Sequence, residues 1–86
     1  MKAASAVSPQ VRTIGRVMPN DKNFFYHSGN NKYYFIRGDM PYEMDPDTGR
    51  SRKISNTIVT AIAGGKMGSI YLLTPQKVVC YFLAYI

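Results

Sequence analysis

The chain has 86 residues, of which 45% are hydrophobic and 13% aromatic, and a formal net charge of +6. This length excludes two separate cores, and the apolar share excludes an intrinsically disordered chain. One cysteine excludes an internal disulfide, and no apolar run is long enough to span a membrane. With no signal-peptide pattern at its start, the chain is predicted to be cytoplasmic.

The positive charge is unevenly distributed. Eleven lysine and arginine residues stand against five acidic residues, and four of those acids fall within 39–47. The basic remainder favours an anionic partner, namely nucleic acid, an anionic small molecule of the nucleotide type or an acidic protein surface. Solubility alone is an equally good explanation of a charge of this size.

The chain begins with small and polar residues, which predict a flexible tail over 1–9. A single β-rich domain is expected over 10–86. Alternating side chains predict a first strand over 10–18, and the following Pro-Asn-Asp-Lys predicts a turn at 19–22.

The clearest local pattern is a β-hairpin over 23–37. Two aromatic runs flank Ser28-Gly29-Asn30-Asn31, and Gly and Asn accept positive φ angles at little cost. Each arm carries rings on both of its faces. One face is therefore expected in the core, and the other is expected to expose rings.

A polar region follows the hairpin. A short edge strand is expected over 40–44, because its proline cannot donate to a ladder. A strong turn signal over 45–49 leads to the basic arm 50–53. Residues 55–63 suit either a strand or a short helix, and the glycine-rich stretch 64–68 is predicted to be a loop.

The most apolar part of the chain is its C-terminal hairpin, with arms over 70–73 and 78–86. The second arm is apolar on both faces. It is therefore expected to be central in the fold or to bury one face against another chain, which predicts a homodimer or higher oligomer. Cys80 is expected to be a small buried side chain in this arm.

These elements predict a mainly β fold, with α+β as the alternative. Five or six antiparallel strands are expected to form a small barrel or a curled sheet. At most one short helix is expected, near 55–63.

The aromatic hairpin is the best candidate site, because rings on a sheet stack on bases while nearby cations hold phosphates. Lys66 joins it through a possible anion nest of glycine N–H groups, although a plain loop is the simpler interpretation. The rings also suit a hydrophobic core. The candidate ligand-binding residues are Tyr26, His27, Lys32, Tyr33, Tyr34, Arg37 and Lys66. The candidate partner-binding residues are Arg50, Arg52 and Lys53.

No metal site or cofactor is predicted. Glu43, Asp45 and Asp47 alternate as in a calcium loop. However, Thr48 occupies the position that requires glycine, and Ile54 occupies the position that requires glutamate.

No catalytic residue is predicted, since His27 is the one histidine and no nucleophile–base pair is specified. The main hypothesis is a small, basic, non-enzymatic binding module for nucleic acid or a nucleotide-type molecule. One alternative is a protein-binding inhibitor or adaptor of the phage or mobile-element type. Another is a small ribonuclease-like toxin that uses His27, Glu43 and Arg37.

Overall fold

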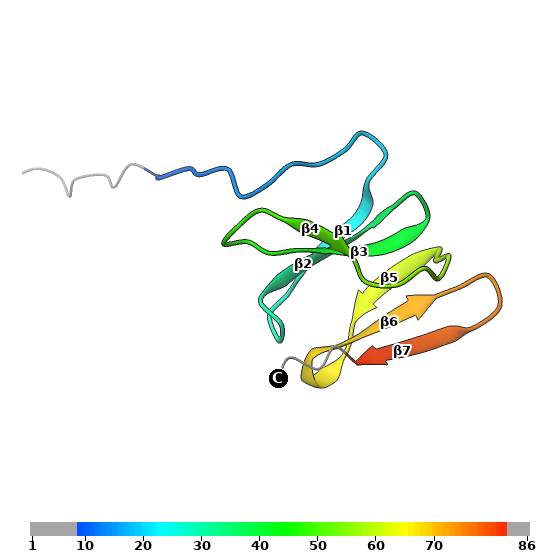
Figure 1. Ribbon diagram of the computed structural model, residues 1–86. Helices are drawn as coiled ribbons and strands as arrows, with labels where there is room; N and C mark the ends of the chain where they lie inside the picture. Colours follow the sequence, from blue (N-terminus) through cyan, green and yellow to red (C-terminus); the bar gives the residue numbers. More distant parts are fainter. Residues whose placement is uncertain (1–8, 83–86) are drawn as a thin grey trace, which may run out of the picture.

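The computed structural model describes residues 9–82, which form two antiparallel sheets (Figure 1). The four-stranded sheet has the order β1-β2-β3-β4 and the three-stranded sheet the order β5-β6-β7. One turn of 3-10 helix, Lys66–Gly68, precedes β6. The strands are β1 Lys22–His27, β2 Lys32–Arg37, β3 Met40–Met44, β4 Ser51–Lys53, β5 Ala61–Gly64, β6 Ser69–Leu73 and β7 Val78–Phe82.

The predicted mainly β fold is confirmed, as a pair of curled sheets that do not close into a barrel. The described residues contain seven strands rather than five or six. They contain no α-helix, and the stretch 55–63 is irregular until β5 begins at Ala61. Apart from residue 9, the predicted tail lies outside the described residues.

The predicted aromatic hairpin is β1 and β2, joined by a turn in which Asn31 has a φ of 53°. The expected edge strand is β3, but this strand lies between β2 and β4. Pro41 is tolerated there because it lies just beyond the paired residues of β3 and β4, opposite the end of β4. Ile54 N–H donates to the Pro41 carbonyl at 3.0 Å, and the Tyr81 hydroxyl donates to the Ile54 carbonyl at 3.0 Å. A tyrosine thus replaces the donor that proline lacks.

The predicted C-terminal hairpin is β6 and β7, and the last part of its predicted second arm, 83–86, lies outside the described residues. Its turn is closed by Thr74, whose Oγ1 accepts hydrogen bonds from the N–H groups of Gln76 and Lys77. The expectation of a central strand is wrong, because β7 pairs only with β6 among the described strands and forms an edge of its sheet. The expected burial of Cys80 is also wrong, because no described residue covers the face of the sheet that carries it.

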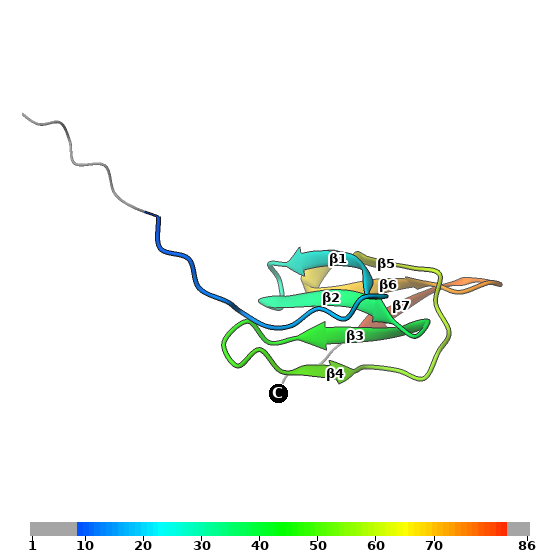
Figure 2. The same cartoon turned by 90° about the horizontal axis from the view of Figure 1, so that it is seen from above.

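No strand forms over 10–18. This segment crosses the face of the four-stranded sheet instead of pairing with one of its edge strands (Figure 2). Its alternating side chains therefore do not belong to a strand. Gly15 lies so close to Met44 that a Cβ at this glycine would fall 2.6 Å from the Met44 sulfur. A Cβ at Gly49, whose φ is 74°, would likewise fall too close to the carbonyl oxygen of Ile14.

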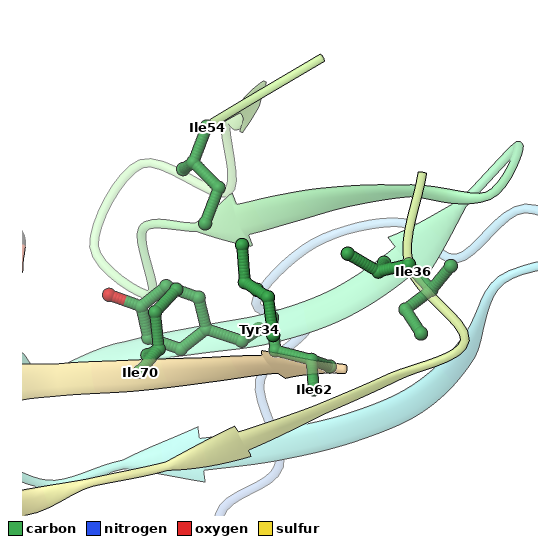
Figure 3. Close-up of a cluster of buried hydrophobic side chains, with 7 residues drawn as sticks. Tyr34, Ile36, Ile54, Ile62 and Ile70 are labelled. Atoms are coloured by element: carbon green, nitrogen blue, oxygen red, sulfur yellow. The ribbon is translucent and has the colours of Figure 1, made fainter. Parts of the chain in front are cut away.

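The core lies between the two sheets (Figure 3). Tyr34 and Ile36 of β2 pack against residues of β5 and β6, with further residues from the irregular segment between the sheets. Hydrogen bonds also join the layers: Asn23 Nδ2 donates to the Ile62 carbonyl at 2.9 Å, and Asn30 Nδ2 donates to the Gly68 carbonyl at 2.7 Å. The buried cluster comprises Tyr34, Ile36, Ile54, Val59, Ile62, Ile70 and Leu72.

Two neighbouring leucines test the orientation of β6. Leu72 is 1% exposed and Leu73 is 42% exposed. We expect Leu72→Ala to lower the free energy of unfolding by ~2–5 kcal/mol, because it leaves a cavity between the sheets. The control Leu73→Ala should cost less than about 1 kcal/mol. Urea denaturation measures both, and equal losses would contradict this orientation.

Candidate functional site

The predicted ligand-binding residues of the hairpin lie on both faces of the four-stranded sheet. We call the face that packs on the three-stranded sheet the inner face, and the opposite one the outer face. Tyr26 and Tyr33 pair on the outer face, with their ring centroids 5.2 Å apart. His27 and Tyr34 lie on the inner face, with their ring centroids 6.0 Å apart. The predicted residues therefore do not share one surface, because neighbouring residues of a strand point to opposite faces.

His27 and Tyr34 belong to the core rather than to an exposed surface. Tyr34 is fully buried, and His27 is 8% exposed. The His27 Nδ1 accepts from the N–H of Gly29 at 3.1 Å, so Nε2 carries the proton and donates to the Ser69 carbonyl at 2.8 Å. Both ring nitrogens are thus occupied in holding a turn and joining the sheets.

A stack of side chains covers part of the outer face. The ring of Phe35 is fully buried and lies parallel to that of Phe24, with a centroid distance of 4.5 Å. Tyr42 stacks on it from the other side at 5.7 Å. The Arg37 guanidinium lies 4.9 Å from the Phe35 centroid and 5.1 Å from that of Tyr42. Arg37 therefore caps this stack as a cation–π partner.

Arg37 is also fixed by a bidentate salt bridge. Its Nε and Nη2 donate to the two carboxylate oxygens of Asp21, at 2.8 Å and 2.7 Å. These hydrogen bonds hold the pKa of Asp21 below its ordinary value of 3.8, although burial opposes the shift. They also raise the pKa of Arg37. The predicted ligand contact is therefore already engaged within the protein.

An aromatic groove of about 330 Å³ lies beside this stack. Phe24, Tyr33 and Met44 form its floor, and the crossing segment forms one wall and contributes Arg12. Tyr26 extends the row of rings and is 49% exposed. We call the groove with Tyr26 the outer groove.

A second pocket, of about 380 Å³, lies on the same face and shares Thr13, Ile14 and Gly15 with the outer groove. It contains Arg16 and Arg37. The arginines of this segment were not predicted as site residues, because the segment itself was predicted to be a strand. Phe24 was predicted to lie in the hairpin but not in the site, although it alternates in step with Tyr26.

The inner face carries a pocket of mixed charge, of about 470 Å³. It combines Lys32, from the predicted ligand-binding set, with Arg50 and Arg52, from the predicted partner-binding set. Glu43 and Asp45 also line it. Glu43 is almost fully buried, and its carboxylate accepts from the Tyr34 hydroxyl at 3.1 Å and from Arg52 Nε at 2.6 Å.

Two predicted residues lie apart from these pockets. Lys53 follows Arg52 and pairs with Tyr42, so it points to the outer face. Lys66 is exposed in the 3-10 turn before β6, and it lines neither the outer groove nor the mixed-charge pocket.

Comparisons with protein-family models, with curated proteins and with solved structures found no match. Within residues 9–82, no three side chains of the His, Cys, Asp or Glu type are grouped as metal ligands. No helix in this part of the chain is both long and apolar enough to cross a membrane.

The Asp21–Arg37 salt bridge gives a pH-dependent stability. Because folding lowers the pKa of Asp21, its contribution is present above 3.8 and is lost as the pH falls through the folded-state value. We expect Asp21→Asn to be less stable than the wild type by about 1–2 kcal/mol at neutral pH. At a pH well below 3.8, protonated Asp21 resembles asparagine and the difference should vanish.

Urea denaturation at the two pH values measures this difference. Asp39→Asn is the control, because Asp39 is exposed in a turn with a φ of 62°, which asparagine accepts. The assignment fails if Asp21→Asn loses the same stability at both pH values.

Proposed function

We propose that this chain is a non-enzymatic binding module for nucleic acid or a nucleotide-type molecule, and that the ligand binds in the outer groove. One observation carries the proposal: Phe24, Tyr26 and Tyr33 present rings at the surface beside Arg12 of the crossing segment. Aromatic faces stack on bases whatever their sequence, and an adjacent guanidinium holds phosphate.

The balance of charge favours the outer face over the mixed-charge pocket. Arg12, Arg16 and Lys53 add positive charge to the outer face, while Arg37 is neutralised by Asp21. In the mixed-charge pocket, three cations are opposed by Glu43 and Asp45, which repel an anion at close range. The larger pocket is therefore the weaker candidate for a phosphate-containing ligand.

The hydrogen bonds of His27 support a binding module without catalysis. A toxin of the ribonuclease type would need this histidine to exchange a proton with its substrate, whereas both ring nitrogens are hydrogen-bonded to the protein backbone, at Gly29 and Ser69. A cytoplasmic location is part of the proposal, because an exposed single thiol persists best in a reducing compartment. The inhibitor or adaptor alternative remains a prediction.

Loss of one stacking ring tests the site. We expect Tyr33→Ala to weaken binding of a single-stranded oligonucleotide of about 12 residues by roughly 5- to 100-fold, the value of one base–ring contact. The control is Tyr71→Ala, since Tyr71 is an exposed tyrosine of the other sheet. Fluorescence anisotropy with labelled DNA and RNA measures affinity, and a mononucleotide competitor distinguishes a strand from a small ligand.

Salt dependence tests the arginine. Arg12→Ser should weaken binding and reduce the slope of log K against log salt by about one, the loss of one phosphate contact. Lys77→Ser removes the same charge from the turn between β6 and β7 and should leave the slope unchanged. The proposal is wrong if the wild type binds neither oligonucleotide nor mononucleotide at low salt.

A further inference from the structure

The three-stranded sheet has an outer face that no described part of the chain covers. Along β6 and β7, Tyr71, Leu73, Val78 and Phe82 are between 41% and 69% exposed. A shallow hollow of about 240 Å³ lies over this face. We call it the apolar face, and it comprises Ala61, Ala63, Tyr71, Leu73, Val78, Cys80 and Phe82.

Strand pairing gives the apolar face a graded shape. Rows run across the sheet from Ala61 to Leu73 to Val78 and from Ala63 to Tyr71 to Cys80. The β5 column is therefore made of small side chains, whereas the β6 and β7 columns carry larger ones. In Figure 1, β5 and β7 form opposite edges of this sheet.

This gradient is self-complementary under one symmetry operation. A two-fold axis that runs parallel to β6, between two sheets packed face to face, places the β5 of one copy opposite the β7 of the other. Alanines then face valine and cysteine, so the larger side chains of β7 in each copy enter the shallow β5 edge of its partner, while the two β6 columns meet along the axis. A two-fold axis across the strands would instead oppose β7 to β7 and leave the two β5 columns facing each other.

The exposed area and the charge of the apolar face both suit an interface with a second copy of the chain. At the exposures given above, the four large side chains leave on the order of 500 Å² of accessible surface per copy. Two copies would bury about 1,000 Å², which is the lower limit for a specific interface. No residue of β5, β6 or β7 is charged, so two chains of charge +6 can meet here without opposing charged side chains of these strands.

We infer that the apolar face is the interface of a weak homodimer, in which two three-stranded sheets pack face to face with β5 of each copy opposite β7 of the other. The inference is independent of the outer groove, which lies on the other sheet. Dimerisation and ligand binding should also respond oppositely to salt. Salt screens the repulsion between copies and should strengthen the dimer, whereas it weakens nucleic-acid binding.

Sedimentation velocity over an about hundredfold range of concentration tests the dimer. The wild type should pass from monomer to dimer, with the midpoint at lower concentration in higher salt. Val78→Lys should raise the dissociation constant at least tenfold, because it places a charge in the interface. The control is Val17→Lys, as Val17 lies in the segment that crosses the four-stranded sheet and has an exposure of 63% against 65% for Val78.

Ala63→Phe distinguishes this arrangement from unspecific apolar association. It enlarges the exposed apolar area but fills the edge that receives the partner's bulky column, so we expect a weaker dimer. Thermal melting followed by circular dichroism checks that each variant folds. A wild type that stays monomeric, an equal loss in Val17→Lys and Val78→Lys, or a stronger dimer in Ala63→Phe would each overturn the inference.

Discussion

The structure depends on β2, a strand of the four-stranded sheet that has fully buried side chains on both faces. Tyr34 and Ile36 face the second sheet, and Phe35 on the opposite face is enclosed by Phe24 and Tyr42. All three β2 side chains are less than 2% exposed. A strand buried in this way fixes which face of each neighbouring strand looks inward, because the pleat leaves no freedom in register.

Burial of Tyr34 also brings a polar group into the interior, where it needs partners. Its hydroxyl accepts from Asn30 and donates to Glu43, which in turn receives a hydrogen bond from Arg52. This chain of bonds crosses the inner face from the β1–β2 turn to β4. Across the described residues, no fully buried side-chain nitrogen or oxygen is left without a partner. The mixed-charge pocket is therefore the exposed end of a structural network.

Local patterns predicted the hairpins but not their assembly. The Gly-Asn turn of the first hairpin, the Asp-Pro turn after β3 and the Thr-Pro turn of the last hairpin all depend on short-range backbone preferences that a sequence states directly. Which face of an aromatic strand is buried depends on the second sheet. For that reason Tyr34 and His27 were predicted to share a surface with Tyr26 and Tyr33, although they lie on the opposite face.

Two further differences have the same origin. The segment over 10–18 alternates like a strand, yet strand formation requires a free edge in register, and this segment lies across a face. Cys80 lies in a sequence suited to burial on both faces, but a face is buried only when another part of the structure covers it, and no described residue covers the face that carries Cys80. Neither condition is encoded in the residues of the segment itself.

The order of strands has a consequence for how the chain folds. Within residues 9–82, each strand pairs only with strands next to it in sequence, β1 to β4 in one sheet and β5 to β7 in the other. Each sheet can thus form by the successive closure of short loops, without a long search through the chain. The longest-range contacts are those between the two sheets, on either side of the irregular segment that contains Ile54 and Val59. We therefore expect the docking of the two local meanders to limit the rate of folding.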